Sequence, residues 1–291
     1  MAITAEYKHE VHELLKKYVD RYDSINRAAE SLNNVSGSTI RTIFRGGEYP
    51  NISEAMWRSI YKQVSGEEQN GTVLIETTAS KDILFCMEVV QKTKGFTWII
   101  SPAGSGKSVS SEIMKSRKNV FYVLCDEDMA KSDFAQEMAR AVGLRVNTQK
   151  KARAIILDVV QEISELEDVL FIFDEGDKLN DKIIHYFITI YNHLKGKAGV
   201  VFCSTDYMEK RMKNGLKFNK RGFQELWSRI GRKFYHAEKN TPYDVENLCR
   251  ANAVTSRRDI DVVVKETIAA DMDLRRADIK IKAINLSKLS A

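Results

Sequence analysis

The sequence contains few prolines and few cysteines, and it has no long apolar run. Three prolines among 291 residues do not make a collagen-like or disordered chain. The longest apolar runs, such as Phe96 to Ile100, are far too short to span a bilayer. The cysteines are far apart and form no Cys-x-x-Cys pair, which argues against a zinc knuckle and a disulfide framework. They are Cys86, Cys125, Cys203 and Cys249.

The N-terminus also lacks the apolar core of a secretory signal, since Glu6, Lys8, His9 and Glu10 follow one another closely. We therefore expect no targeting signal, no membrane partner and a cytoplasmic protein. Apolar residues make up 43% and charged residues 29% of the chain, as in a helix-rich globular protein. At about 150 residues per domain, this length predicts two units.

The positive charge is concentrated in one segment. The net charge is +5, and residues 206–239 alone contain ten Lys or Arg against four Asp or Glu. A basic segment of this kind indicates either a nucleic-acid partner or simply a solvated surface, and charge alone does not decide between them.

Residues 1–65 are predicted to form a small helix-turn-helix domain. A first apolar face at helical spacing includes Val11, Leu15 and Val19, and a later helix over 37–45 buries Ile40 and Ile43. The outer face of that helix consists of hydrogen-bonding side chains that could contact DNA. These are Ser38, Thr39, Arg41, Thr42 and Arg45. Residues 66–76 read as a linker.

From residue 77 onward, apolar runs alternate with amphipathic helices. This alternation is typical of an α/β fold with a parallel sheet covered on both faces. We assign residues 77–240 to this nucleotide-binding subdomain and residues 241–291, where only helical periodicity remains, to a helical lid. Strands are predicted at 96–100, 120–124, 169–173, 199–203 and 233–236.

A phosphate-binding loop follows the first predicted strand. The segment Ser101 to Ser108 lies between an apolar strand and a helix, which is the context that a P-loop requires. Glycines let backbone N–H groups surround phosphate oxygens, Lys107 would reach the β- and γ-phosphates, and Ser108 would bind Mg²⁺. Ser101 stands where the usual pattern has glycine. The predicted ATP contacts are Pro102, Ala103, Gly104, Ser105, Gly106, Lys107, Ser108 and Val109.

A second motif is the apolar strand that ends in Asp174 and Glu175, about 70 residues after the P-loop. Asp174 would hold the Mg²⁺, and Glu175 would orient and polarise the attacking water. The alternative interpretation of Asp174 and Glu175 is a strand that ends in solvent at an acidic turn. We would favour that interpretation if the sequence lacked Lys107. A later strand ends at Thr205, which is another polar group placed near the phosphates.

Together these residues resemble the AAA+ ATPases, and among them the MuB-type transposition proteins of phage Mu, over nearly the whole chain. The resemblance implies that Thr205 is the sensor 1 residue and that Arg229, in Leu226-Trp227-Ser228-Arg229-Ile230, is the arginine finger. It also implies that Arg275 is the sensor 2 residue in the lid. Arg232 or Arg276 could take the arginine roles instead. Gly176 stands where relatives commonly have alanine.

The resemblance further implies a bacterial protein, or one encoded by a phage or other mobile element. It would form ATP-dependent helical homo-oligomers on double-stranded DNA, act with a cognate transposase, and hydrolyse ATP in a manner that depends on the oligomer and on DNA. Such filaments contact the phosphate backbone without reading the sequence. The candidate backbone contacts are Lys150, Lys151, Arg153, Lys210, Arg211 and Lys213.

Two other functions fit the same motifs. A transcription regulator could sense ATP at the P-loop and read an operator through residues 38–45, in which case one DNA site would be strongly preferred. A helicase loader would share the ATPase core but favour single strands. No spaced Asp/Asp/Glu set occurs outside the ATPase motifs, so strand transfer would have to come from a partner.

Overall fold

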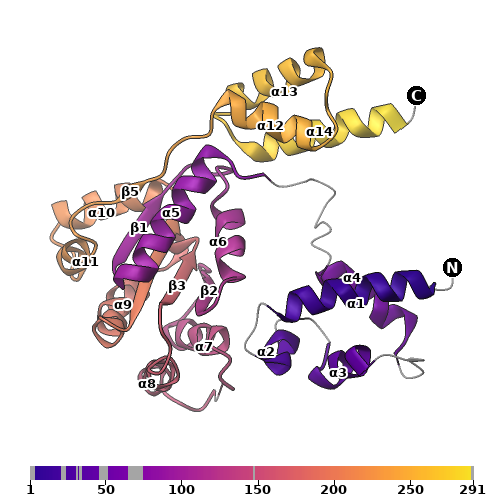
Figure 1. The fold of residues 1–291 in the computed structure, drawn as a ribbon. Coiled ribbons are helices and arrows are strands. Elements are labelled where there is room, and N and C mark those ends of the chain that lie inside the picture. Colours follow the sequence, from indigo (N-terminus) through magenta and orange to yellow (C-terminus); the bar gives the residue numbers. More distant parts are fainter. Residues whose placement is uncertain are drawn as a thin grey trace. The chain divides into compact units, whose positions relative to one another are not determined.

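A computed structural model describes residues 4–20, 24–30, 32, 35–45, 52–64, 75–146 and 148–289 (Figure 1). The chain divides into two compact units, residues 1–73 and residues 74–291. The predicted linker at 66–76 lies outside the described residues except for its last two positions.

The described residues of the first unit form four helices: α1 (Ala5–Val19), α2 (Ile25–Glu30), α3 (Gly37–Arg45) and α4 (Glu54–Val64). Thr4 caps α1 and Ser36 caps α3 through side-chain oxygens that accept backbone N–H groups. Apolar faces of all four helices meet in one core, with Ile40, Ile43 and Trp57 completely buried. The helix predicted over 37–45 is α3.

The second unit contains a five-stranded parallel sheet in the order β2-β3-β4-β1-β5. The strands are β1 (Phe96–Ile100), β2 (Val120–Leu124), β3 (Val169–Asp174), β4 (Ala198–Ser204) and β5 (Tyr235–His236). The α/β fold with a parallel sheet is therefore confirmed. Only β5 is shorter than predicted, because Tyr235 and His236 are the residues that pair with β1.

Helices cover both faces of the sheet (Figure 1). Successive residues of β3 alternate between two apolar clusters, since Leu170 and Ile172 pack with one and Phe171 and Phe173 with the other. The first face carries α5 (Thr78–Thr93) and α6 (Lys107–Lys115). The opposite face carries five helices. They are α7 (Lys131–Ala141), α8 (Ala152–Glu162), α9 (Asp181–Leu194), α10 (Tyr207–Lys217) and α11 (Phe223–Arg229).

The C-terminal region is helical, as expected, and consists of α12 (Pro242–Ala251), α13 (Arg257–Ala269) and α14 (Leu274–Leu289). These helices have a small core of their own around Val245, Val263 and Ile281. Thr241 caps α12, and Asp244 joins this cap to α5 by accepting the Thr78 N–H at 2.9 Å. In the described part of the chain, no helix combines the length and apolar character needed to cross a membrane.

Candidate functional site

The P-loop lies at the carboxyl edge of the sheet, between the end of β1 and the start of α6. Gly104 (φ +68°) and Gly106 (φ +108°) both adopt left-handed backbone conformations that a β-carbon would strain. Gly106 is the residue before the first turn of α6, whose N–H groups have no helical acceptor. A loop of this geometry presents backbone donors and a helix N-terminus to an anion.

Ser101 fits at the position where the usual pattern has glycine. Its φ is not in the left-handed region, so the backbone does not require glycine there. Its N–H donates to the Ser204 carbonyl at 3.1 Å, and its hydroxyl donates to Ser105 Oγ at 2.7 Å. Both serines are buried. The substitution therefore adds a hydrogen bond that ties the two ends of the loop together.

Lys107 is folded along the loop that precedes it. Its Nζ donates to the carbonyls of Ser101 and Pro102, each at 2.7 Å. Burial lowers the pKa of Lys107, and the nearby carboxylates of Asp174 and Asp177 oppose that shift. The ammonium thus lies where phosphate oxygens could replace its carbonyl acceptors.

Asp174 ends β3 as a buried carboxylate, 1% exposed. Burial raises its pKa, while a hydrogen bond from the Ser108 hydroxyl and one from the Glu175 N–H (2.9 Å) oppose the shift. The two predicted Mg²⁺ ligands, Ser108 and Asp174, are therefore in contact. One carboxylate and one hydroxyl, with phosphates and waters completing the shell, form a donor set that suits Mg²⁺.

Glu175 has a left-handed backbone (φ +54°), which is uncommon for a residue other than glycine, asparagine or aspartate. It begins the short 3-10 turn η1 (Gly176–Lys178), and its carboxylate forms an ion pair with Lys178. The hydrogen bond between these two side chains raises the pKa of Lys178. The tight turn separates the Glu175 side chain from that of Asp174, in keeping with two different roles.

The structure adds Asp177, a residue that the sequence motifs did not single out. Thr205 donates its hydroxyl to Asp177 Oδ2 at 2.5 Å and its N–H to the same oxygen at 3.3 Å. Asp177 thereby holds Thr205 at the end of β4, beside the acidic strand. The second aspartate of Asp174-Glu175-Gly176-Asp177 is the only sequence signal that could have identified it.

The lid contacts the P-loop directly. The Leu274 N–H donates to the Gly104 carbonyl at 3.0 Å. Asn240, which precedes the lid, adds a bond from its Nδ2 to the Ser105 carbonyl at 3.0 Å. Asp273 accepts the Arg275 N–H at 2.9 Å and so caps α14. The charge of Arg275 is close enough to lower the pKa of Lys107, although burial is the main cause of that shift.

The remaining arginine candidates differ in their surroundings. Arg276 donates to Glu266 at 2.5 Å, so its guanidinium is engaged within the lid. Arg229 lies over the Tyr191 ring, 5.9 Å from the centroid, and donates to Asn192 at 3.3 Å. Arg232 is exposed in the turn after α11.

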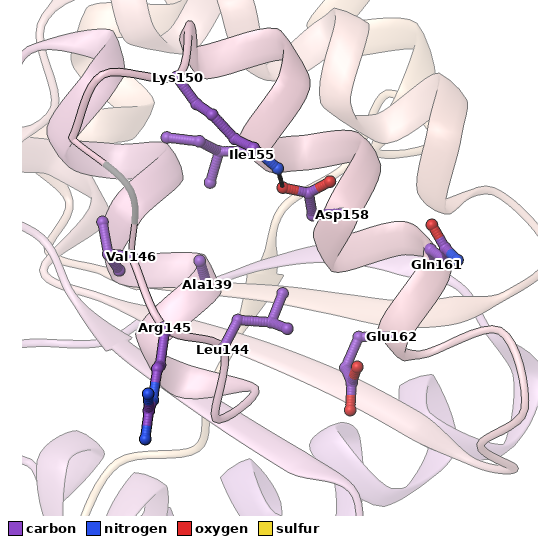
Figure 2. A pocket seen from close by; sticks show the side chains of 9 residues that line it. All are labelled: Ala139, Leu144, Arg145, Val146, Lys150, Ile155, Asp158, Gln161 and Glu162. Atoms are coloured by element: carbon purple, nitrogen blue, oxygen red, sulfur yellow. Dashed lines mark hydrogen bonds and ion pairs between the residues drawn. The ribbon is translucent and has the colours of Figure 1, made fainter.

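The predicted DNA contacts of the second unit belong to two segments, one at the start of α8 and one in α10. Lys150 forms an ion pair with Asp158 (2.6 Å) at the rim of an open cavity of about 430 Å³ between α7 and α8, as Figure 2 shows. Lys151 and Arg153, at the start of α8, are exposed. Exposed Lys210 and Lys213 pair with acidic side chains one turn earlier in α10.

Arg211 is the exception, because its side chain is only 16% exposed. It donates to the carbonyls of Asp177 (3.3 Å) and Leu179 (2.6 Å) and forms an ion pair with Asp181. These bonds give Arg211 a structural role, since they fix α10 against the turn that follows the acidic strand.

The outer face of α3 is hydrogen-bonded within its own unit. Arg41 donates to Asn26 at 2.7 Å, and Thr42 donates to the Ser38 carbonyl at 2.9 Å. Thr39 and Ser38 share hydrogen bonds with Ser36. Ser38, Arg41 and Arg45 are exposed, so the face remains accessible in the helical unit.

Residues 90–212 match the protein family described as AAA domain. No curated protein matches the sequence. Among solved structures, ORC2 of Aeropyrum pernix in its ADPNP–ADP complexes is similar, with 13% identity and a TM-score of 0.57, over 77% of this chain and 66% of that one. For Cdc6p of Pyrobaculum aerophilum, the identity is 13%, the TM-score is 0.51, and the two coverages are 73% and 62%.

ORC1 of Aeropyrum pernix in complex with DNA gives a TM-score of 0.49 at 13% identity, over 74% of this chain and 61% of that one. The chain thus spans less than two thirds of the length of these three structures. At such low identity, the likeness of Cdc6p and ORC2 concerns the fold. Residues 90–212 match the AAA domain family, and three helices, α12 to α14, form the described end of the chain after the sheet. The resemblance to MuB-type proteins rests on the sequence motifs.

Proposed function

We propose that this protein is an ATP-hydrolysing switch that assembles on double-stranded DNA and selects target sites for a transposase. One observation carries the ATPase part of the proposal. Lys107, Ser108, Asp174 and the Thr205–Asp177 pair come from three separate segments and meet at one edge of the sheet. That is the arrangement phosphoryl transfer requires, because the reaction depends on positioning and charge compensation.

Each residue has a role in this scheme. The P-loop N–H groups and Lys107 would hold the phosphates. The Thr205 hydroxyl, whose one proton goes to Asp177 in this structure, would turn that proton to the γ-phosphate while the Thr205 N–H keeps its bond to Asp177. Glu175 would accept a hydrogen bond from the attacking water and orient it in line with the γ-phosphorus. Mg²⁺ held by Ser108 and Asp174 would neutralise charge on the phosphate oxygens. Release of Glu175 from Lys178 is part of this proposal, since the ion pair occupies its carboxylate.

The DNA part of the proposal rests on charge. Exposed lysines and arginines of α8 and α10 would contact the phosphate backbone, and the helical unit would add contacts through the α3 face. Such contacts do not distinguish sequences, so the protein would accept many target sites. Assembly would couple hydrolysis to DNA, because an arginine from one subunit would complete the site of the next.

Two variants test the ATPase assignment. Lys107→Ala should abolish nucleotide binding, whereas Glu175→Gln should bind ATP normally and hydrolyse it at least about a hundredfold more slowly. Binding of a fluorescent ATP analogue and phosphate release would measure the two steps separately. Hydrolysis at the native rate by Glu175→Gln would show that another residue orients the water.

The same proteins test the DNA assignment. We expect regular filaments on random-sequence duplex DNA only with ATP and Mg²⁺, visible by negative-stain electron microscopy. Filaments of Glu175→Gln should persist after ATP is diluted away. Discrete particles at one sequence would instead favour an operator-reading regulator.

A helicase loader is the second candidate. Its support is the AAA+ fold shared with Cdc6p, at a TM-score of 0.51, together with an ATPase core common to both functions. Strand preference separates the two functions. Tighter binding to single-stranded than to duplex DNA would favour the loader.

A further inference from the structure

The turn between α10 and α11 displays an apolar ring to solvent. Phe218 is 67% exposed. A single exposed apolar side chain is common on protein surfaces, so its exposure has meaning only through the way the fold holds it and the residues around it. The question is whether the ring is exposed because the turn is loose or because the fold holds it there.

The backbone shows that the turn is well defined. Asn219 has a left-handed conformation (φ +50°), its N–H donates to the Leu216 carbonyl at 3.2 Å, and the Lys220 N–H donates to the Gly215 carbonyl at 2.8 Å. These two bonds form a Schellman motif, which fixes the end of a helix. Phe218 is the last residue before this fixed turn.

Close packing of Gly215 and Gly222 against neighbouring rings holds the turn between α10 and α11 in place. Gly215 is buried, and a β-carbon there would lie 2.2 Å from the Phe223 ring. Gly222, with φ +88°, closely approaches the His185 ring. Two glycines therefore allow the turn to rest tightly on α9 and α11 while Phe218 faces outward. The exposed ring is built into the fold.

The surroundings of the ring are basic. From Lys210 to Gln224 the sequence has six Lys or Arg and no Asp or Glu. Lys217 Nζ lies 5.5 Å from the centroid of the Phe218 ring. Lys220 is 55% exposed and pairs with Asp181 at 3.7 Å. Within the described residues, Lys217 and Arg221 have no carboxylate partner, so their charges are available to a ligand.

An exposed aromatic ring flanked by two cations that have no carboxylate partner among the described residues, Lys217 and Arg221, matches nucleic acid better than protein. Lysine is depleted in the cores of protein interfaces, whereas phosphate contacts require it. Aromatic rings stack on bases in single strands or insert between base steps in a duplex.

We propose that the turn formed by Lys217, Phe218, Asn219, Lys220 and Arg221 is a DNA-contact site. Phe218 would lie against a base or sugar while the flanking cations hold the phosphates. This inference rests on the proposed DNA-dependent function and locates one of its contact surfaces.

The test is DNA binding of the full chain with ATP and Mg²⁺, by fluorescence anisotropy over a range of salt concentrations, with a duplex and a single strand of the same length. Phe218→Ala should weaken binding about tenfold with an unchanged salt slope, because stacking is apolar. Arg221→Ala should lower the slope by about one, as expected for one lost phosphate contact. Phe218→Trp should restore affinity to within about twofold, because its ring can also stack.

Phe85 provides a matched control. It is a phenylalanine with similar exposure (63%), but it lies on α5 one turn before Val89 and close to Glu88. Phe85→Ala should leave DNA affinity unchanged, and a loss equal to that of Phe218→Ala would overturn the inference. It would also be overturned if Phe218→Ala bound DNA normally, or if it impaired self-association without DNA. Absence of DNA binding by the unaltered protein would reject the proposed function itself.

Discussion

At the scale of single residues, Gly176 of the acidic motif packs directly against two aromatic rings of the sheet, Phe202 and Trp98. A β-carbon on Gly176 would lie 2.7 Å from Phe202 Cδ1 and 3.3 Å from Trp98 Cζ2. Those two rings stack with centroids 4.4 Å apart, and Trp98 donates to Ser204 at 2.6 Å. Glycine at this position therefore reflects the large aromatic pair below it and places Asp177 close enough to hold Thr205.

The Thr205–Asp177 pair leads to a prediction about catalysis. Asp177→Ala removes the acceptor that orients the Thr205 hydroxyl, so we expect kcat to fall about tenfold or more while nucleotide affinity changes little. Thr205→Val should have the same effect, and the double variant should be no worse than either single one. Steady-state ATPase rates and calorimetric titration would measure both quantities. Additive losses would show that the two residues act separately.

At the scale of elements, α14 is connected to the P-loop by its N-terminal residues. The Leu274 N–H bonds to Gly104, and the carboxylate of the capping residue Asp273 lies so close that a β-carbon on Gly104 would come within 1.6 Å of its Oδ1. The helix that carries Arg275 is thus positioned by contact with the loop that would bind phosphate. Movement of either element must affect the other.

Substitution of Gly104 tests this connection. Gly104→Ala should push Asp273 away, reduce nucleotide affinity about tenfold and speed hydrogen exchange at the Leu274 amide, which loses its acceptor geometry. Gly196→Ala is the matched control, because Gly196 also has a positive φ (+75°) but no atom within 4 Å of the added carbon. Equal effects of the two substitutions would attribute the loss to backbone strain alone.

At the scale of the whole molecule, two units with separate cores share one chain. The nucleotide unit contains the P-loop, acidic strand and lid, and we propose that its site is completed by a second copy of the chain. Arg229 and Arg232 are the candidates for that completion. Arg229 is held over Tyr191, and Arg232 is exposed.

Mixing two inactive variants, Lys107→Ala and Arg229→Ala, tests whether an arginine of one chain completes the nucleotide site of another. Lys107→Ala chains would retain the arginine, and Arg229→Ala chains would retain the P-loop, so a mixture on DNA should regain measurable ATPase activity that neither protein has alone. The same mixture made with Arg232→Ala would identify which arginine acts. Activity in Arg229→Ala and Arg232→Ala chains at the native level would argue against a finger at either position.

The sequence by itself determined the class of fold, and it predicts the location of the phosphate site. Alternating apolar runs and amphipathic helices predicted the parallel sheet, because strands buried on both faces must be apolar throughout. The spacing of Gly104, Gly106 and Lys107 predicted the loop, since its backbone conformation and charge are local properties. The contact of Ser108 with Asp174 followed from two strands ending at the same edge.

Only the tertiary structure decided which polar residues act together and which basic residues are free. Asp177 at the end of one strand binds Thr205 at the end of the next. Asp273 of the lid lies against Gly104 of the P-loop. Arg211 donates to a backbone carbonyl near the acidic turn. Composition gives the number of charges but not their partners. Pairing depends on side-chain positions brought together by packing, and so does the display of Phe218 on a fixed turn.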